Sequence, residues 1–373
     1  MRRKKNLIIF GTRPEAIKMA PLVNQFLKDN RFETKVCVTG QHREMLDQVL
    51  SFFEITPDYD LNLMKPNQNL YNLTGEVISG LKPILESFKP DFVYVHGDTT
   101  TTMAASLAGF YSGAKVCHVE AGLRTNNMLS PFPEEMNRQV ASRIANYHFA
   151  PTIKSQENLL KENVQKENVL ITGNTVIDAL LESSNKVEDL ENKEVIELKS
   201  KVDFKNKVLL ITGHRRENHG QGFINICAAL KEIAIRNQDV EIIYPVHLNP
   251  NVLKPVNELL GNVNNIHLIK PLSYPSFVWL MGRSYLIITD SGGVQEEAPS
   301  LGKPVLVMRE TTERPEAVDA GTVILVGTNT EKIITETQGL LDDLDKYNSM
   351  SSLHNPYGDG KACQRIIEFI ASL

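Results

Sequence analysis

The sequence predicts an α/β protein made of two doubly wound, parallel-sheet domains. Short apolar runs of strand length alternate with longer stretches of helical spacing, which is typical of parallel sheets covered by helices on both faces. The alternation is interrupted once, by a polar and charged helical stretch at residues 183–200, and then restarts. A chain of 373 residues also exceeds the usual size of one hydrophobic core, so two domains are expected.

The first half of the chain contains at least five predicted strand and helix pairs. The strands are expected at residues 7–10, 34–38, 92–95, 115–119 and 169–172, with helices after most of them. We place the linker near residues 173–178, just before the polar stretch. The first domain is therefore expected to span residues 1–174.

The same alternation defines a second domain at residues 175–359. Its strands are expected at residues 208–211, 241–244, 266–269, 286–289 and 304–308. The last segment, residues 360–373, has apolar residues at helical spacing, and its spacing leaves open whether it packs on the second domain or back on the first. Two such domains side by side would form a cleft between the carboxyl ends of their strands, where we expect the ligand and the active site.

Composition limits the classes of protein that the chain can belong to. Hydrophobic residues make up 42% and charged residues 23%, as in globular proteins, and the net charge of -5 argues against nucleic acid as a general partner. No apolar stretch approaches the roughly 20 residues that cross a bilayer, and the apolar run after the basic start is too short for a signal peptide. The four cysteines are widely spaced, which indicates reduced thiols in a cytoplasmic protein.

Three carboxylates follow or flank the predicted strands of the first domain. Asp98 and Glu120 come where two neighbouring strands end, and Glu134 begins a predicted helix shortly afterwards. Carboxylates that share one site cannot all ionise freely, so their pKa values are expected to be pushed apart. Groups with separated pKa values suit proton transfer. Ion pairing along the helix explains Glu135 with Arg138 but does not explain Glu134.

A glycine turn follows the predicted strand at residues 286–289. Ser291, Gly292 and Gly293 lead from that strand into a helix expected at residues 294–301, where backbone amides could bind a diphosphate. Glu297, inside this helix, could accept hydrogen bonds from ribose hydroxyls. The alternative is an ordinary serine cap with glycines in a tight turn.

Basic residues follow the first predicted strand of each domain. Arg13 and Lys18 could bring positive charge to phosphates, although solvation at the surface would explain either one alone. His214 has two arginines beside it and could donate to a phosphate or act as an acid or base near neutral pH. His247 also follows a predicted strand, and its role is less determined.

Five motifs follow one another along the chain: GTRPEAIKMAP at 11–21, HGDT at 96–99, HVEAGLR at 118–124, GHRRE at 213–217 and DSGGVQEE at 290–297. Together they resemble the non-hydrolysing UDP-N-acetylglucosamine 2-epimerases of bacteria and archaea. The resemblance implies two Rossmann-like domains of the glycosyltransferase B type and a homodimer. It also implies interconversion of UDP-GlcNAc and UDP-ManNAc by anti elimination of UDP to 2-acetamidoglucal and syn return, without a metal or another cofactor.

The resemblance also assigns roles to individual residues. It makes Asp98, Glu120 and Glu134 the acid/base set, with Asp98 or Glu134 as the base at C2, and it places His214 at the diphosphate. The implied UDP and substrate contacts are Arg13, Lys18, Asp98, Glu120, His214, Leu272 through its backbone, Phe277 at the uracil, Ser291, Gly292, Gly293, Glu297 and Arg314. The implied acid/base set therefore lies in the first domain, and His214, the fourth implied catalytic residue, lies in the second with most of the UDP contacts.

Many bacterial relatives bind a second UDP-GlcNAc as an activator. The matching positions are Gln41, His42, Arg215 and His247. Residues 65–67 lack an arginine that some relatives carry, and Glu44 replaces a glutamine, so these departures argue against activation.

Three other functions remain open at this point. A glycosyltransferase of the same fold could use the same nucleotide site, and a hydrolysing epimerase would release free N-acetylmannosamine and UDP. A non-catalytic nucleotide-sugar sensor would not need the three carboxylates together. The expected role of the non-hydrolysing reaction is to supply N-acetylmannosamine precursors for surface polysaccharides.

Overall fold

The computed structural model describes residues 2–40, 43–65 and 68–373, and the chain divides into two compact units. Unit 1 comprises Met1–Ala179 and Tyr357–Leu373, and unit 2 comprises Leu180–Pro356. The division falls inside the helix α7 (Thr175–Lys186), so the predicted linker at residues 173–178 lies partly within a helix. The polar stretch after it is not one helix, because α7 ends at Lys186 and α8 begins at Lys193.

Unit 1 contains a parallel sheet whose strands follow the order β3-β2-β1-β4-β5-β6-β7 in the described residues. Its strands are β1 (Lys4–Phe10), β2 (Phe32–Val38), β3 (Tyr59–Asp60), β4 (Phe92–His96), β5 (Lys115–Val119), β6 (Tyr147–Ala150) and β7 (Val169–Ile171). Its helices are α1 (Arg13–Lys28), α2 (Arg43–Phe52), α3 (Leu70–Phe88), α4 (Thr100–Tyr111), α5 (Glu134–Ile144), α6 (Ile153–Lys161), η1 (Lys166–Asn168), the start of α7 and α16 (Ala362–Ser372).

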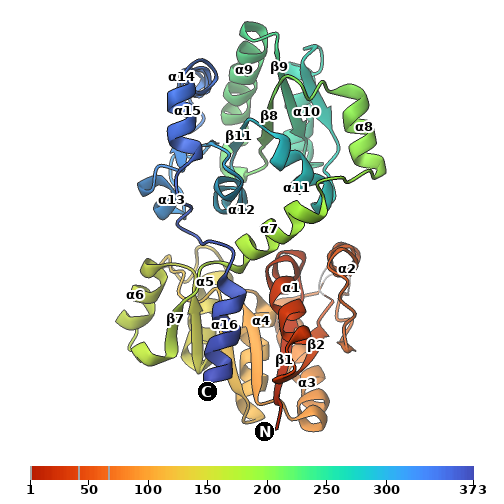
Figure 1. Cartoon of the computed structure of the whole chain (residues 1–373), viewed down its shortest axis with the longest axis vertical. Helices are drawn as coiled ribbons and strands as arrows, with labels where there is room; N and C mark the ends of the chain where they lie inside the picture. Colours follow the sequence, from red (N-terminus) through yellow and green to blue (C-terminus); the bar gives the residue numbers. More distant parts are fainter. Residues whose placement is uncertain (1, 41–42, 66–67) are drawn as a thin grey trace. The chain divides into compact units, whose positions relative to one another are not determined.

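Helices cover both faces of this sheet, as the alternation of its buried side chains requires. Leu7, Val93 and Val95 pack with α3 and α4 in one apolar cluster. Tyr94 points to the opposite face and contacts Phe26 of α1, with ring centroids 5.2 Å apart. On that face α16 packs beside α1, and Figure 1 shows the two helices over the same side of the sheet. The last helix therefore belongs to the core of unit 1.

Unit 2 contains a second parallel sheet, with the strand order β10-β9-β8-β11-β12-β13 in its described residues. Its strands are β8 (Lys207–Thr212), β9 (Val240–Pro245), β10 (Ile266–Ile269), β11 (Leu286–Thr289), β12 (Val305–Val307) and β13 (Val323–Leu325). Its helices are α8 (Lys193–Lys201), η2 (Arg216–Asn218), α9 (Gln221–Arg236), α10 (Pro250–Leu260), α11 (Tyr274–Arg283), α12 (Gly292–Glu297), η3 (Ala298–Leu301), α13 (Pro315–Asp319), α14 (Thr330–Asp342) and α15 (Leu344–Ser351).

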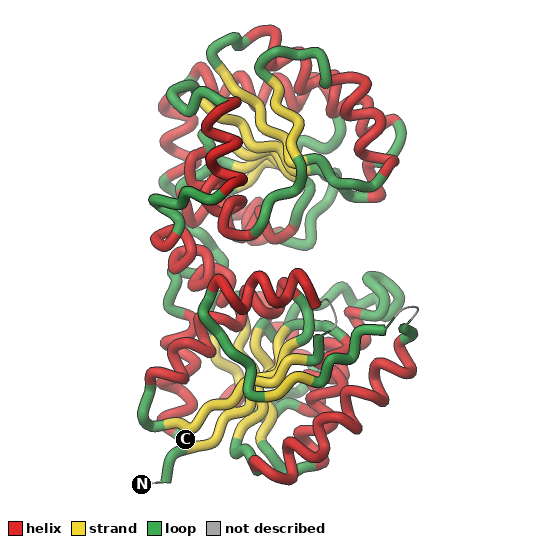
Figure 2. Tube along the Cα trace, turned by 90° about the vertical axis from the view of Figure 1, so that its right-hand side faces the viewer, coloured by secondary structure: helices red, strands yellow, loops and turns green. Residues whose placement is uncertain are grey.

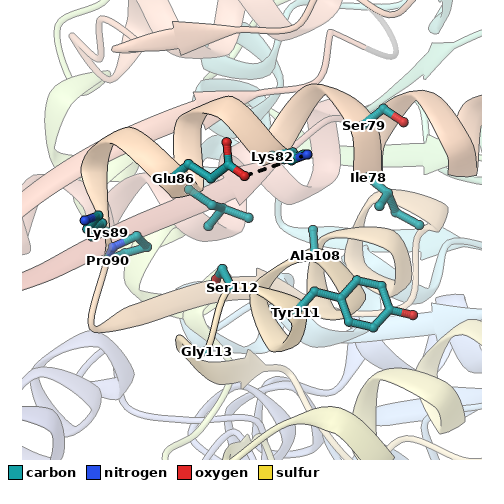
Figure 3. A pocket seen from close by; sticks show the side chains of 11 residues that line it. Ile78, Ser79, Lys82, Glu86, Lys89, Pro90, Ala108, Tyr111, Ser112 and Gly113 are labelled. Atoms are coloured by element: carbon teal, nitrogen blue, oxygen red, sulfur yellow. Dashed lines mark ion pairs between the residues drawn. The ribbon is translucent and has the colours of Figure 1, made fainter.

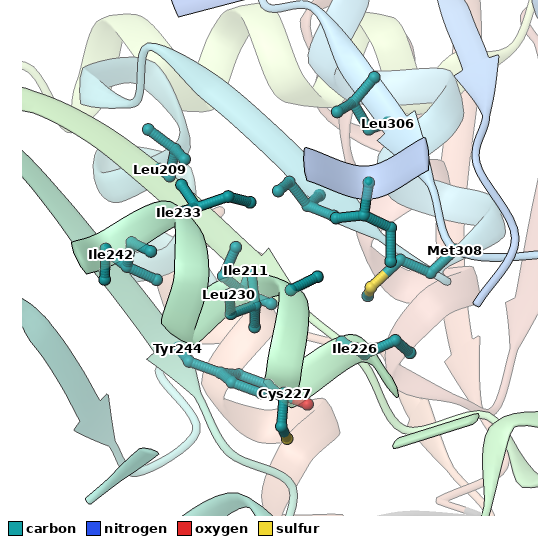
Figure 4. Close-up of a cluster of buried hydrophobic side chains, with 14 of the residues drawn as sticks. Leu209, Ile211, Ile226, Cys227, Leu230, Ile233, Ile242, Tyr244, Leu306 and Met308 are labelled. Carbon is teal, nitrogen blue, oxygen red and sulfur yellow. The ribbon is translucent and has the colours of Figure 1, made fainter. Parts of the chain in front are cut away.

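A buried apolar cluster holds α9, α10 and α14 against one face of this second sheet. Leu209 and Ile211 of β8 face Leu230 and Ile233 of α9, and all four side chains are fully buried (Figure 4). The strands in both units are drawn between helices in Figure 2. The two doubly wound parallel sheets confirm the predicted fold class.

The ten predicted strands are present with ends shifted by up to three residues, and three further strands were missed. β3 and β13 are only two and three residues long, which is too short for a periodic signal. β6 was missed because His148 interrupts its apolar run, although the side chain is 2% exposed in the structure. A buried polar residue in the middle of a strand therefore hides that strand from pattern reasoning.

Each sheet reverses its strand order at one point, between β1 and β4 in unit 1 and between β8 and β11 in unit 2. Ligands of open α/β sheets bind outside the carboxyl ends of the strands at such a point. The loops there begin at Gly11 and Gly97 in unit 1 and at Gly213 and Asp290 in unit 2. Of the residues selected from the sequence, these four loops carry Asp98, His214, Arg215 and Ser291.

Candidate active site

The two loops at the reversal point of unit 1 are joined by a buried glutamate. Thr12 caps α1 and Glu15 completes a capping box, in which Glu15 Oε2 accepts from the backbone N–H of Thr12 at 2.8 Å and of Gly11 at 3.0 Å. The other oxygen, Oε1, accepts from the Thr99 hydroxyl at 2.6 Å. Thr99 caps α4 and follows Asp98 directly. Glu15 therefore holds the Asp98 loop against the start of α1.

Glu120 lies directly after β5 with its side chain 8% exposed. It forms an ion pair with Lys18 of α1, and His96 Nε2 lies 3.4 Å from its Oε2. Burial raises the pKa of Glu120, but Lys18 and His96 outweigh burial and hold that pKa well below its usual range. Its backbone has φ +59°, a left-handed conformation that costs on the order of 1 kcal/mol outside glycine. The structure thus holds an ionised carboxylate in a strained turn.

Asp98 and Glu134 lie in different surroundings. Asp98 is the more open, with a side chain 30% exposed, and it forms an ion pair with Arg138 of α5. Glu134 is the first residue of α5, and its Oε2 is buried with no hydrogen-bond partner among the described residues. A Cβ atom placed on Gly97 would lie 4.0 Å from Glu120 Oε1, so Asp98 and Glu120 belong to one cluster.

Two buried histidines support this cluster from within the sheet. His118 Nε2 lies 2.7 Å from the carbonyl of Gly97, and His148 is its register partner on β6. Burial lowers the pKa of His118 to about 3 and that of His148 to about 4. Both imidazoles are therefore neutral at pH 7. The Nε2–H group of His118 donates to the backbone carbonyl of Gly97, the residue before Asp98.

In unit 2 the buried carboxylate of Asp290 organises the loop after β8. Its Oδ2 accepts from the backbone N–H groups of His214 and Arg215, each at 2.8 Å, and from Asn218 Nδ2 at 3.3 Å. Asp290 is fully buried at the end of β11. One side chain thus fixes the two reversal-point loops of unit 2 relative to each other.

The His214 imidazole lies at the open side of that loop and stacks on His247, with ring centroids 5.4 Å apart and an angle of 15° between the planes. Burial lowers the pKa of His214, Asp290 raises it, and His247 and Arg215 lower it further, with a net decrease. The neutral ring has one N–H that can donate to a phosphate oxygen.

Two arginines lie over the glycine turn of unit 2. A Cβ atom on Gly292 would lie 3.7 Å from Arg314 Nη2 and 3.9 Å from Arg215 Nη2. Arg314 is held by an ion pair with Glu296, which is 2% exposed. The glycine backbone and the two guanidinium groups form a cationic surface that suits an anionic ligand.

A family model described as UDP-N-acetylglucosamine 2-epimerase matches residues 24–371. The chain belongs to this family. The resemblance predicted from the five motifs is confirmed, and with it the prediction of an enzyme, an isomerase.

Relatives of the family cover nearly the whole chain. The UDP-N-acetylglucosamine 2-epimerase of Campylobacter jejuni is 58% identical over 372 residues, which is 98% of this chain and 97% of that protein. The Salmonella typhimurium protein of the same name is 60% identical over 370 residues, or 99% and 98% of the two chains. A crystal structure of the Neisseria meningitidis epimerase bound to UDP-GlcNAc has a TM-score of 0.89 and 54% identity, and the match covers 99% of this chain and 100% of that one.

The remaining residues expected from the epimerase family lie as follows. Arg13 is the first residue of α1, Leu272 is half-buried in the loop before α11, and Phe277 is half-buried in α11. Gln41 and His42 lie outside the described residues.

The helix expected at residues 294–301 in this family member begins earlier and changes type. α12 starts at Gly292, and its last turn continues as the 3-10 helix η3. Ser291 is the cap residue of α12, but its side chain makes no capping hydrogen bond. Ser291 therefore occupies the N-cap position without the side-chain hydrogen bond of an ordinary serine cap.

Sequence reasoning missed two side chains at the acidic cluster of this epimerase family member. His96 is the last residue of β4 and was not singled out, although it sits beside Glu120. Arg138 does form the expected pair with Glu135, at 3.2 Å, but it also reaches Asp98, 40 residues away in the sequence. Helical spacing could reveal only the first of these contacts.

A separate groove of about 700 Å³ lies between α3 and α4 (Figure 3). Lys89 and Pro90 lead into β4, and Ser112 and Gly113 lead towards β5, so the groove is at the amino end of these strands. The acidic cluster is at their carboxyl end, and the groove is not part of it.

Among the described residues, no three His, Cys, Asp or Glu side chains gather in a way that could hold a metal ion. In the same part of the chain, no helix has the length and apolar character needed to cross a membrane.

Proposed function

We propose that this protein interconverts UDP-GlcNAc and UDP-ManNAc without hydrolysis. The observation that carries the proposal is the pair of carboxylates at the ends of β4 and β5, each next to its own cation. Removal of the weakly acidic C2 proton needs such a positioned base. The proposal is also supported by the full-length similarity to proteins named UDP-N-acetylglucosamine 2-epimerase.

The sugar chemistry is assigned to the acidic cluster of unit 1. Asp98 takes the C2 proton, the C–H electron pair forms the C1–C2 double bond, and the C1–O bond breaks with its electrons leaving on UDP. The intermediate is 2-acetamidoglucal. UDP then adds back to C1 while Glu134 delivers a proton to C2 on the opposite face. Glu120, kept ionised by Lys18, favours positive charge that develops near C1 in the transition state.

UDP recognition is assigned to unit 2. Arg215 and Arg314 meet the diphosphate above Gly292 and Gly293, and neutral His214 donates one hydrogen bond to it. Ser291 has a hydroxyl that is not used for capping and contacts a phosphate oxygen. Glu297 accepts hydrogen bonds from the ribose hydroxyls. Leu272, through its backbone, and Phe277 contact the uracil.

The same proposal includes the wider role of the protein. The product UDP-ManNAc supplies N-acetylmannosamine for surface polysaccharides, and the active form is a homodimer, which light scattering on the purified protein tests. Arg215 lies close to Gly292, so it is assigned to the substrate diphosphate in preference to an activator. Of the described residues, His247 is the one assigned to a second, activating UDP-GlcNAc, and it stacks on His214.

Product analysis tests the proposal against its alternatives. Purified protein with UDP-GlcNAc should give a stable mixture of UDP-GlcNAc and UDP-ManNAc in the ¹H NMR spectrum. Steady accumulation of free N-acetylmannosamine and UDP would identify a hydrolysing epimerase instead. Consumption of UDP-GlcNAc that requires an added acceptor sugar would identify a glycosyltransferase. Binding of UDP-GlcNAc without any turnover would identify a sensor.

A further inference from the structure

The helix α5 reaches the Asp98 loop with two consecutive side chains. Asn137 Nδ2 donates to the backbone carbonyl of Asp98 at 3.0 Å, and Arg138 Nη2 forms the ion pair with Asp98 Oδ2. One residue of the loop is thus held at both its backbone and its carboxylate by the same helix. The Arg138 side chain is 11% exposed, so the ion pair is largely shielded from water on the arginine side.

The Arg138 guanidinium is itself fixed by a second carboxylate. Its Nη1 donates to Glu135 Oε2 at 3.2 Å, and the Glu135 side chain is fully buried. Glu135 also accepts from the backbone N–H groups of Thr125 and Asn126, each at 3.0 Å, and from Gln139 Nε2 at 2.9 Å. Burial raises the pKa of Glu135, but these hydrogen bonds and Arg138 lower it overall.

Arg138 thus bridges two carboxylates that have different roles, those of Glu135 and Asp98. Glu135 anchors one side of the planar guanidinium to a rigid loop and cannot move without breaking buried hydrogen bonds. The other side of the guanidinium then has a defined direction, and Asp98 lies there. A lysine could neutralise Asp98 but could not offer the same planar, two-sided contact.

The other two carboxylates selected from the sequence lack this bridge. Glu120 has Lys18 from α1 as its cation, and no ion pair of Glu134 is seen among the described residues. The ion pair of Arg138 therefore distinguishes Asp98 from Glu134, which is the first residue of the same helix.

We propose that Arg138 is the positioning residue that orients the Asp98 carboxylate and keeps it ready to accept the C2 proton. This role rests on the proposed epimerisation. Arg138 acts through Asp98 and does not itself touch the sugar. Glu134, at the start of the same helix, is then the group that carries the proton before re-addition.

The test compares three variants by the rate at which C2 of UDP-GlcNAc exchanges its proton for deuterium in D₂O. R138M should lower kcat by about 100-fold, the loss typical of a reacting group misplaced by about 1 Å, while KM and the affinity for UDP stay close to wild type. R138K keeps the charge and should recover part of the lost rate. R143M is the matched control, because Arg143 is exposed on the same helix and donates to the Glu162 carbonyl, and it should exchange at the wild-type rate.

The outcomes separate this inference from the proposed function. Exchange by R138M at the wild-type rate, with the wild type active, would overturn the positioning role and leave the epimerisation intact. A parallel loss of kcat, UDP affinity and thermal stability in both R138M and R138K would mark a purely structural residue and would also overturn it. No C2 exchange in the wild type would remove the proposed function and this role with it.

Discussion

Lys18 and Glu120 are 102 residues apart in the sequence and form an ion pair beside the carboxyl ends of the central strands of unit 1. Lys18 lies in the second turn of α1, whose start is fixed by the Thr12 and Glu15 capping box. Glu120 occupies a left-handed turn directly after β5. Because the pair joins α1 to the turn after β5, the Glu120 carboxylate has its cation only when these parts of unit 1 are folded together.

Replacing Lys18 by Met should destabilise unit 1 and lower the activity together. Removing one partner of a buried pair leaves the other charge uncompensated, which costs on the order of 3 kcal/mol. Hydrogen exchange of the β5 amides measures the loss. Lys28→Met, an exposed change at the end of the same helix, is the matched control. Equal protection of β5 in both variants would show that the pair contributes nothing.

Acid should weaken unit 1 through its buried histidines. The folded pKa values of about 3 for His118 and about 4 for His148 lie below the ordinary value of 6.5, so below pH 6.5 the unfolded chain binds protons that the folded chain does not. Above pH 6.5 the two histidines do not reduce the free energy of unfolding. As the pH drops from 6.5 towards 4, each histidine lowers that free energy by up to about 1.4 kcal/mol per pH unit. Urea unfolding at several pH values measures the slope.

His148→Gln isolates one of these two groups. Its free energy of unfolding should fall less than that of the wild type between pH 6.5 and pH 5, because one proton-binding site of the unfolded chain is gone. His354→Gln, at an exposed position, should keep the wild-type slope. An unchanged slope in His148→Gln would contradict the assignment of the acid sensitivity to that side chain.

Gly122 should tolerate no side chain. It has φ +97°, and an added Cβ atom would lie 2.2 Å from the backbone oxygen of Ser155. Gly122→Ala should therefore lower the melting temperature, with a cost of more than about 2 kcal/mol. Gly75→Ala is the opposite case inside α3, where the new methyl group meets nothing within 4 Å and should stabilise the helix by about 0.5–1 kcal/mol. An unchanged melting temperature in Gly122→Ala would mean that the turn after β5 can move to accept a side chain.

Asp290→Asn should weaken UDP binding without unfolding unit 2. The amide can still accept through one oxygen, but it loses the charge that holds the His214 and Arg215 backbone amides. Charge-assisted hydrogen bonds of this kind contribute about 1.5–3 kcal/mol, so the Kd for UDP should rise at least about tenfold. Calorimetric titration measures it, and exposed Asp345→Asn is the control. Wild-type affinity would show that Asp290 does not organise the loop.

Much of the fold follows from the sequence because parallel strands buried on both faces form continuous apolar runs. The strands at residues 115–119, 266–269 and 286–289 were predicted with their observed ends. β6 was not predicted, because the burial of His148 depends on its neighbours in the sheet. Local pattern does not contain that information.

The chemistry of the cluster was only partly predictable for the same reason. Motifs selected Asp98, Glu120 and Glu134, but their differences come from cations that are distant in sequence. Lys18 reaches Glu120 from α1, and Arg138 reaches Asp98 from α5. Without the fold, the three carboxylates look alike.

Deuterium exchange at C2 is the most direct test of the proposed proton transfer. UDP-GlcNAc incubated with the wild-type protein in D₂O should gain deuterium at C2 in both epimers, with UDP still attached at equilibrium, and ¹H NMR follows the loss of the C2 signal. Formation of UDP-ManNAc with the original C2 proton retained would contradict a mechanism that passes through the carboxylates of unit 1.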